Sequence, residues 1–185
     1  MKKSTLFLAF ICLIISLKAQ TDVYLVINHK LGDSTFALNQ TARTPGFSSA
    51  EYQTTRLQYY VAEITLIHSG GQRTTIDDKW LLVDASINTR ELLGNYNINT
   101  IDSISFGIGV EASENHSDPS ARAADHPLAP KSPSMHWGWT AGYRFVAFEG
   151  NTGSGFRQSF QIHALGDRNY HIQTQEVDSY MENGE

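Results

Sequence analysis

Apolar and polar residues alternate along several stretches of the chain with the period of two that is typical of half-buried β-strands. The first predicted strand covers residues 23–31, and its apolar face includes His29 near the end. Residues 57–67 are rich in aromatic and β-branched side chains, which favour strands. Further strands are predicted at residues 80–83, 101–110, 135–148, 156–165 and 170–177.

Three stretches break the alternation. Residues 39–54 are polar and contain a Pro-Gly pair, so a loop is predicted there. Residues 88–94 favour one or two helical turns. Residues 111–134 show no sustained periodicity and hold four of the five prolines. The pattern as a whole predicts an all-β fold, an antiparallel two-layer β-sandwich with one long Pro-rich loop.

The N-terminus differs from the rest of the chain. Residues 1–19 combine two lysines near the start, an apolar run over 6–17 and a small residue, Ala19, at the exit, which is the pattern of a secretory signal peptide. The apolar run is shorter than the roughly 20 residues that span a bilayer. We therefore expect an exported protein, periplasmic or secreted, without a transmembrane segment after cleavage. Residues 20–185 are predicted to form one domain, whose abrupt end is either a frayed terminus or a truncated last strand.

Charge and cysteine content narrow the function. The chain carries 14 Lys and Arg against 19 Asp and Glu, a net charge of −5, and this acidity argues against nucleic-acid binding. The one cysteine, Cys12, lies inside the predicted signal peptide. The remaining domain then has no thiolate, so a metal ion would need histidine, methionine, carboxylate or a modified side chain as ligand.

The segment Ser134–Gly150 is the most unusual, because it places two tryptophans in SMHWGWTAGYRFVAFEG. If this segment is extended, Met135, Trp137 and Trp139 share one face and His136 points to the other. The two indoles are then either core residues or the lining of a site beneath the Pro-rich loop.

Histidines are the natural candidates for a metal site without thiolates. Among the seven, no pair has helical HxxxH spacing. His29 lies on an apolar strand face, where a core role competes with a ligand role. Alternation around Phe160 and Ile162 places His163 on the opposite, polar face of its strand, unless a bulge near Gly166 re-aims it. No nucleophile elbow or phosphate-binding loop is present, so no enzyme activity is predicted.

Five segments, taken in order, resemble the MbnP-like copper-binding domain family over about residues 23–166. They are LVINHKLGD, LQYYVAEITL, FGIGVEASENHSDP, MHWGWTAGY and FQIHALGD. The order of the motifs, more than any one of them, carries the resemblance.

The resemblance implies an exported β-domain that binds one copper ion, as Cu(I). In this family the first tryptophan of the Trp-x-Trp motif, Trp137 here, is oxidised to kynurenine by a partner dihaem enzyme of the cytochrome c peroxidase type. His29 and His163 match the family's recurring histidines and are the expected ligands. His136 stands where the family commonly has an aromatic ring and is a possible substitute ligand. The stretch 111–134 is longer and more polar than the loop of the family.

Two other functions are compatible with the same residues. The tryptophans of an exported β-sandwich can stack on a carbohydrate or a peptide without any metal. The domain can also be a structural scaffold that binds neither.

Overall fold

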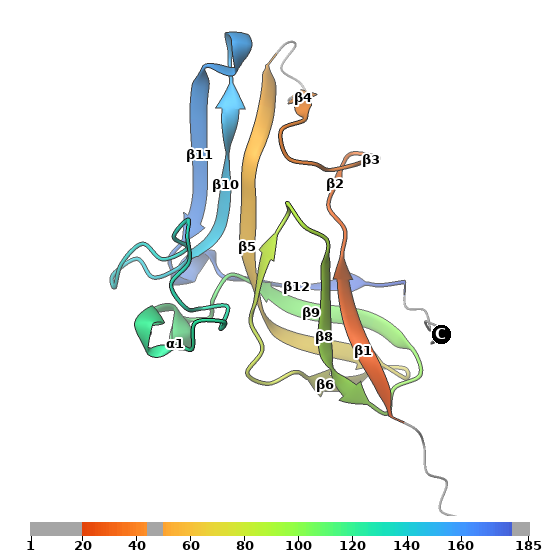
Figure 1. Cartoon of the computed structure of the whole chain (residues 1–185). Helices are drawn as coiled ribbons and strands as arrows, with labels where there is room; N and C mark the ends of the chain where they lie inside the picture. Colours follow the sequence, from red (N-terminus) through yellow and green to blue (C-terminus); the bar gives the residue numbers. More distant parts are fainter. Residues whose placement is uncertain (1–19, 44–49, 179–185) are drawn as a thin grey trace, which may run out of the picture.

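The computed structural model describes residues 20–43 and 50–178, which form an all-β, sandwich-like fold (Figure 1). The strands are β1 (Thr21–Ile27), β2 (Lys30–Leu31), β3 (Ser34–Thr35), β4 (Thr41–Arg43), β5 (Glu51–His68), β6 (Gln72–Thr75), β7 (Leu81–Asp84), β8 (Thr89–Tyr96), β9 (Ile101–Ile108), β10 (Arg144–Thr152), β11 (Gln158–Leu165) and β12 (His171–Glu176). The short helices are α1 (Ala112–Asn115), η1 (Pro119–Ala121), η2 (Ser154–Phe156) and η3 (Asp167–Asn169). The predicted signal peptide and the chain end after Asp178 lie outside the described residues.

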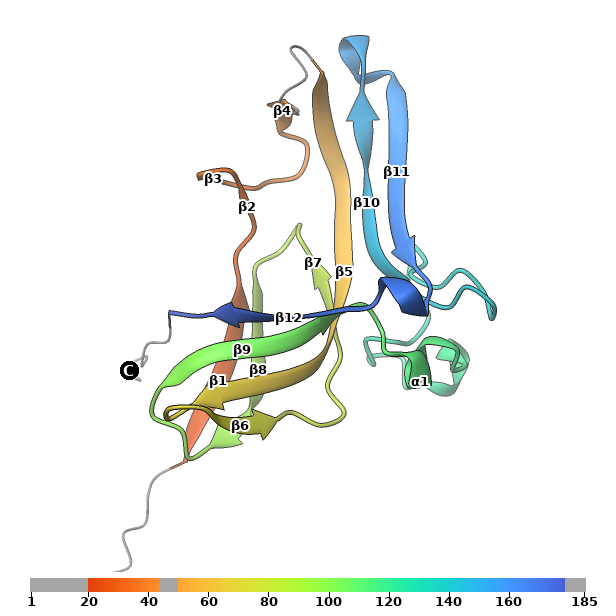
Figure 2. The same cartoon turned by 180° about the vertical axis from the view of Figure 1, so that it is seen from behind.

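Strand β5 organises the fold. It is 18 residues long and forms the centre of an antiparallel sheet with the order β11-β10-β5-β9-β12, while β4, β6 and β7 pair with it separately. Its first half pairs with β10 and its second half with β9, and the strand bends between the two halves (Figures 1 and 2). The bend lies at a register irregularity between Ala62 and Thr65, where Glu63 has a positive φ of 48°.

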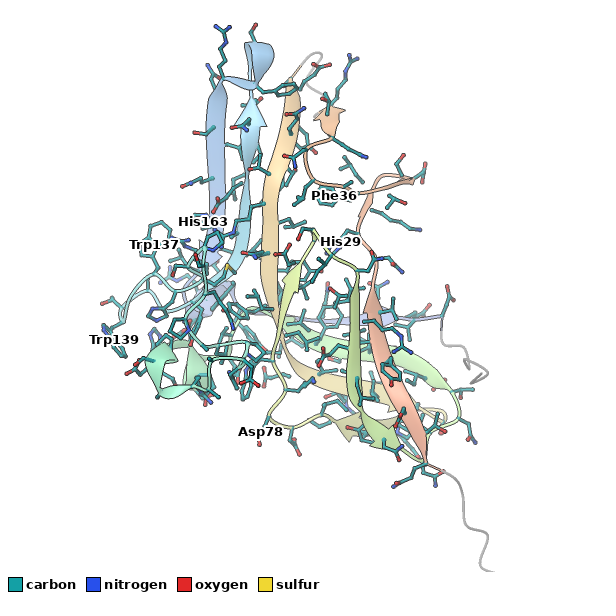
Figure 3. All side chains as sticks on the ribbon, in the orientation of Figure 1. His29, Phe36, Asp78, Trp137, Trp139 and His163 are labelled. Carbon is teal, nitrogen blue, oxygen red and sulfur yellow. The ribbon has the colours of Figure 1, made fainter. Side chains whose placement is uncertain are left out.

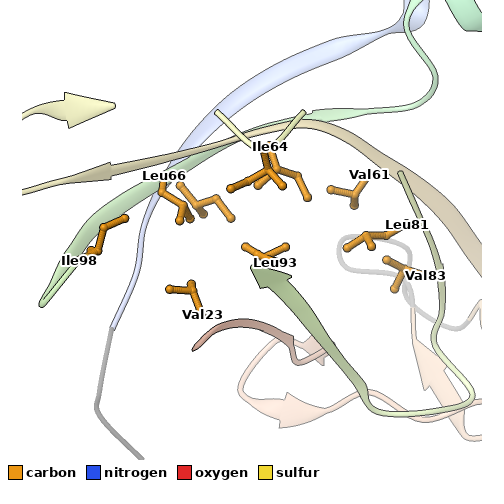
Figure 4. Packing of buried hydrophobic residues seen from close by; sticks show 10 residues of the cluster. Val23, Val61, Ile64, Leu66, Leu81, Val83, Leu93 and Ile98 are labelled. Carbon is orange, nitrogen blue, oxygen red and sulfur yellow. The ribbon is translucent and has the colours of Figure 1, made fainter. Parts of the chain in front are cut away.

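The lower half of the molecule has two layers. The β1–β8 pair crosses over the sheet formed by β5, β9 and β12, and apolar side chains fill the space between them (Figures 1 and 4). The buried members of this first core are Val23, Val61, Ile64, Leu66, Ile76, Leu81, Val83, Leu93, Ile98 and Ile104. The alternation predicted for the first strand is confirmed over residues 23–27, since Val23 faces this core and Tyr24 is exposed. The strand ends at Ile27, however, and Leu31, predicted on the same apolar face, is 45% exposed in the separate strand β2.

A second core lies on the opposite face of β5, beneath the segment between β9 and β10. Its buried members are Tyr60, Val110, Leu128, Met135, Tyr143, Phe145 and Ala147. Tyr60 belongs to this second core and its neighbour Val61 to the first, because successive residues of a strand point to opposite faces. The Pro-rich segment is therefore the cover of a core rather than a free loop.

Three predictions about secondary structure are wrong. Residues 89–94 belong to strand β8 instead of a helix, because Leu93 packs into the first core and the backbone pairs with β1. The predicted loop over 39–54 contains β4 and the start of β5, which pair with each other. Their side chains are mostly polar, so no apolar alternation marks these strands in the sequence.

The predicted single strand over 135–148 is also wrong. A turn occupies its first part, and β10 begins at Arg144. As a result Met135 is 1% exposed, whereas Trp137 and Trp139 are 52% and 62% exposed, so the three side chains do not share one face.

The face predicted for His163 is corrected as well. Ile162, placed on the apolar face from the sequence, is 60% exposed, while the side chain of His163 is 8% exposed. His163 pairs with Ala147 of β10, which is fully buried, and therefore lies on the covered face of the sheet. The bulge in this region lies in β10, between Arg144 and Val146.

In the described part of the chain, no helix has the length and apolar character needed to cross a membrane.

Candidate functional site

Trp137 and His163 meet on the surface beside the β10–β11 pair (Figure 3). Their ring centroids are 5.4 Å apart and the ring planes are inclined by 65°. Trp137 belongs to the turn that precedes β10, and His163 to β11, so two segments distant in sequence create the contact. The indole is open to solvent on one side, while the imidazole beneath it is largely covered.

The turn that carries Trp137 is fixed by its own backbone. The N–H of Trp137 donates to the carbonyl of Gly142 at 2.8 Å, and the N–H of Gly142 donates to the carbonyl of Gly138 at 2.8 Å. Gly138 has φ +107° and Gly142 φ +72°, a backbone that L side chains rarely adopt. These two glycines explain why the segment turns where its side-chain pattern favours a strand.

A cation lies against the same indole. The guanidinium carbon of Arg144 is 4.4 Å from the centroid of the Trp137 ring, within the range of a cation–π contact. Arg144 also donates from Nη1 to the carbonyl of Ser134 at 2.8 Å. The indole thus contacts both the guanidinium of Arg144 and the imidazole of His163.

Glu149 connects His163 to a second arginine. Its Oε1 atom accepts from Nε2 of His163 at 2.8 Å and from Nη1 of Arg56 at 2.9 Å. Burial would raise the pKa of Glu149, but the hydrogen bond from His163 and the charge of Arg56 outweigh it, so the pKa is lowered. The carboxylate is therefore ionised and paired on both sides.

Sulfur is present close to this network. Nη2 of Arg56 lies 3.1 Å from Sδ of the buried Met135, which places a thioether within the cluster. Neither Glu149 nor Arg56 stands out in the sequence pattern. Their pairing depends on the register of β5 against β10, and sequence alone shows only that each lies in a strand.

His29 lies outside this cluster. Its Nε2 is joined to the hydroxyl of Tyr59 by a 2.9 Å hydrogen bond, and burial lowers its pKa. In the register of the sheet, His163 shares a face with Ala147 and Gln58, so Tyr59, the next residue along, points to the other face. Figure 3 shows His29 and His163 on opposite sides of β5.

His136 contacts other residues of the tryptophan turn. Its Nδ1 accepts from the N–H of Gly138 at 3.2 Å, and its ring packs edge-on against Tyr143 with centroids 5.0 Å apart. Its Nε2 is buried without a hydrogen-bond partner, and burial lowers the pKa of the ring. The structure thus brings Trp137 and His163 together, and it places His29 and His136 elsewhere.

Across residues 20–43 and 50–178, no three histidine, cysteine, aspartate or glutamate side chains are grouped to hold a metal ion. The site offers the imidazole of His163 and, close by, the thioether of Met135. An intact indole has no free lone pair on nitrogen, so unmodified Trp137 is not itself a metal ligand.

The profile of the MbnP family matches residues 20–183. The chain belongs to the MbnP family. Among solved structures, it is similar in fold to MbnP from Methylosinus trichosporium, with a TM-score of 0.60 and 17% sequence identity. The match covers 78% of this chain and 62% of that one, so the chain spans less than two thirds of the length of the Methylosinus structure. No match is found among curated proteins.

Proposed function

We propose that this MbnP-family protein is exported to the periplasm and binds one copper ion, Cu(I), at a site built around Trp137 and His163. The observation that supports this proposal is that the two ring centroids lie 5.4 Å apart. Trp137 is the tryptophan of the family motif, and His163 is one of the two histidines expected as ligands from the sequence. Copper is the cargo of this protein, and the protein acts in copper homeostasis.

The chemistry of the site requires modification of Trp137. Two equivalents of hydrogen peroxide, consumed at the partner enzyme, would break the C2–C3 bond of the indole and give N-formylkynurenine and two water molecules. Hydrolysis with one further water molecule would then release formate and leave kynurenine, with an aromatic amine beside His163. Nitrogen donors in low number suit a d¹⁰ ion such as Cu(I). The exposed indole is accessible to a partner enzyme, and the proposed modifier is a dihaem enzyme of the cytochrome c peroxidase type.

The residues around Trp137 fit this assignment in part. His163 is covered, hydrogen-bonded and close to the indole, as a preorganised ligand should be. The ligand roles of His29 and His136 remain predictions from sequence. His29 can join the same ion only if the β1–β2 region moves relative to β5, since it now lies on the other face of the sheet.

The test is made on mature protein purified from its native host. Proteolytic peptides containing Trp137 are expected to show a mass gain of about 4 Da, together with one copper per chain by elemental analysis. His163→Ala is expected to lose the copper and keep the fold. His29→Ala and His136→Ala then report whether either residue completes the site. An unmodified Trp137 in a copper-free protein from copper-replete cells contradicts the proposal.

A second function is favoured by the exposure of the tryptophans. At 52% and 62% exposed, Trp137 and Trp139 offer flat apolar faces on which a carbohydrate can stack. This function requires that soluble sugars quench the tryptophan fluorescence of metal-free protein and that Trp139→Ala removes the effect. Quenching by Cu(I) alone favours the copper site.

A further inference from the structure

We propose that Glu149 is the positioning residue of the copper site: it holds the proton of His163 on Nε2 and so leaves Nδ1 as the nitrogen that binds the metal. This inference rests on the proposed function for the identity of the ion. The assignment of the ring proton itself follows from contacts within the protein.

The first step is the direction of one hydrogen bond. Oε1 of Glu149 lies 2.8 Å from Nε2 of His163. An ionised carboxylate only accepts hydrogen bonds, so Nε2 must carry the hydrogen. In the neutral ring the free lone pair is then on Nδ1.

The second step concerns access to Nδ1. In the described part of the chain, Nδ1 of His163 has no hydrogen-bond partner, yet it is not among the side-chain atoms that are both fully buried and unpartnered. The side chain is 8% exposed. The small accessible part of the imidazole therefore includes the nitrogen that has the lone pair.

The third step is the rigidity of Glu149. Glu149 and His163 lie on the same face of the β10–β11 pair at diagonal positions, because His163 pairs with Ala147, two residues before Glu149. Arg56, directly opposite Glu149 on β5, donates to the same carboxylate oxygen at 2.9 Å. Arg56 is itself held, since its Nε donates to Oε1 of Gln58 at 2.8 Å.

These contacts form a chain from Gln58 through Arg56 and Glu149 to His163. A carboxylate behind a metal-binding histidine fixes the orientation of the ring and increases its basicity, and its loss typically weakens metal binding about 10- to 100-fold. In this protein the carboxylate also keeps the imidazole facing Trp137. The charge of Arg56 also offsets the negative charge of Glu149.

The ring proton can be measured without copper. Histidine is labelled with ¹⁵N in the metal-free protein, and long-range ¹H–¹⁵N correlation at mildly alkaline pH identifies the protonated nitrogen of His163. We expect hydrogen on Nε2, with a slowly exchanging Nε2–H signal. A hydrogen on Nδ1 in the wild-type protein overturns the proposal, whatever the variants do.

Two variants separate positioning from general support of the fold. Glu149→Gln keeps an oxygen that can accept from Nε2–H, so the slow Nε2–H signal and most of the copper affinity should remain. Glu149→Ala removes the acceptor, so the signal should be lost and Cu(I) affinity should fall about 10- to 100-fold. Glu51→Ala is the matched control, because it removes the carboxylate of another arginine pair, Arg43–Glu51, and should change neither.

Copper affinity is measured by competition with a chromophoric Cu(I) chelator, using protein that has kynurenine at position 137. Equal affinity of Glu149→Ala and wild type overturns the role of Glu149. Absence of copper binding by the modified wild-type protein overturns the proposed function instead, and the ring-proton measurement still shows whether Glu149 sets the protonation of His163.

Discussion

Oδ1 of Asn115 accepts a hydrogen bond from the backbone N–H of Tyr143 at 2.8 Å, and this bond ties helix α1 to the turn that carries both exposed tryptophans. Asn115 is fully buried, and its Nδ2 donates to Oδ1 of Asp167 at 2.7 Å. One amide side chain therefore links three segments, the helix, the tryptophan turn and the η3 turn. Both its oxygen and its nitrogen are needed, because the first must accept and the second must donate.

Asn115→Asp tests this link. The substitution keeps the shape but replaces the donor by a second carboxylate oxygen facing Asp167, so we expect a loss of about 2–4 kcal/mol in the free energy of unfolding. The measurement is chemical denaturation followed by circular dichroism. Asn97→Asp, at an exposed position, is the control and should stay within about 0.5 kcal/mol of wild type. Equal effects of the two variants would show that Asn115 has no special role.

The two arginine pairs of strand β5 should differ in their contribution to stability. Arg56 and Glu149 have side chains 12% and 18% exposed, whereas Arg43 and Glu51 are 76% and 41% exposed. Arg56→Gln leaves a partly buried carboxylate without its cation and should cost about 3 kcal/mol. Arg43→Gln should cost at most about 1 kcal/mol, because water already screens that pair. Thermal unfolding of the two variants side by side gives the comparison, and similar losses would contradict it.

His116 should make the stability of the tryptophan turn depend on pH. Its Nδ1 donates to the carbonyl of Trp139 at 3.1 Å and its Nε2 lies 3.2 Å from both oxygens of Asp167, so both ring nitrogens face acceptors. The hydrogen bond to the Trp139 carbonyl and the contact with Asp167 raise the pKa of His116 above 6.5. The stabilisation is thus complete below the unfolded-state pKa of about 6.5 and is lost as the pH rises through the higher folded-state pKa.

The measurement compares wild type with His116→Gln across pH. The difference in melting temperature should be largest at about pH 6 and should shrink as the pH is raised to about 8.5. Gln175→Asn, on the exposed strand β12, changes no titratable group and should show no such trend. A difference that grows with pH would mean that His116 acts as a neutral ring.

Two glycines with similar backbone angles should respond differently to substitution. Gly109 has φ +121° and an added Cβ would lie 2.7 Å from the ring of Phe145, whereas Gly138 has φ +107° and nothing within 4 Å of that position. Gly138→Ala should therefore cost only backbone strain, about 1–3 kcal/mol. Gly109→Ala adds a clash in the second core and should cost more, which denaturant titration of both variants will show.

The sequence was sufficient to predict the fold class and the positions of several of the main strands. Alternation depends on local burial, so β1, β7, β9, β11 and β12 fall close to where their patterns indicated. It could not show that Leu93 lies in a strand rather than a helix, because that depends on the pairing of β8 with β1, which is far away in the chain. Pattern alone also could not distinguish the two faces of β11, since Ile162 is apolar yet exposed.

The sequence predicted two residues of the candidate site but not the hydrogen bonds that surround them. Trp137 and His163 were named from sequence motifs, and the structure places their rings in contact. Arg56 and Glu149 were missed because each is an ordinary charged residue in a strand, and only the pairing of β5 with β10 brings them together. The prediction that His29 and Trp137 bind the same copper ion required both side chains to lie on the same face of the sheet. No local sequence pattern shows which face each of them occupies.

Strand β5 also has a consequence for folding. Its residues Tyr60 and Val61 belong to different cores, so loss of one core removes backbone support from the other. The two halves of the described protein should therefore unfold in one cooperative transition. Folding should be slow for a domain of this size, because contacts such as Arg56–Glu149 join residues 93 positions apart and the loop between them must close first. Because strand β5 pairs with β10 only late in folding, the site around Trp137 and His163 forms only after most of the chain has folded.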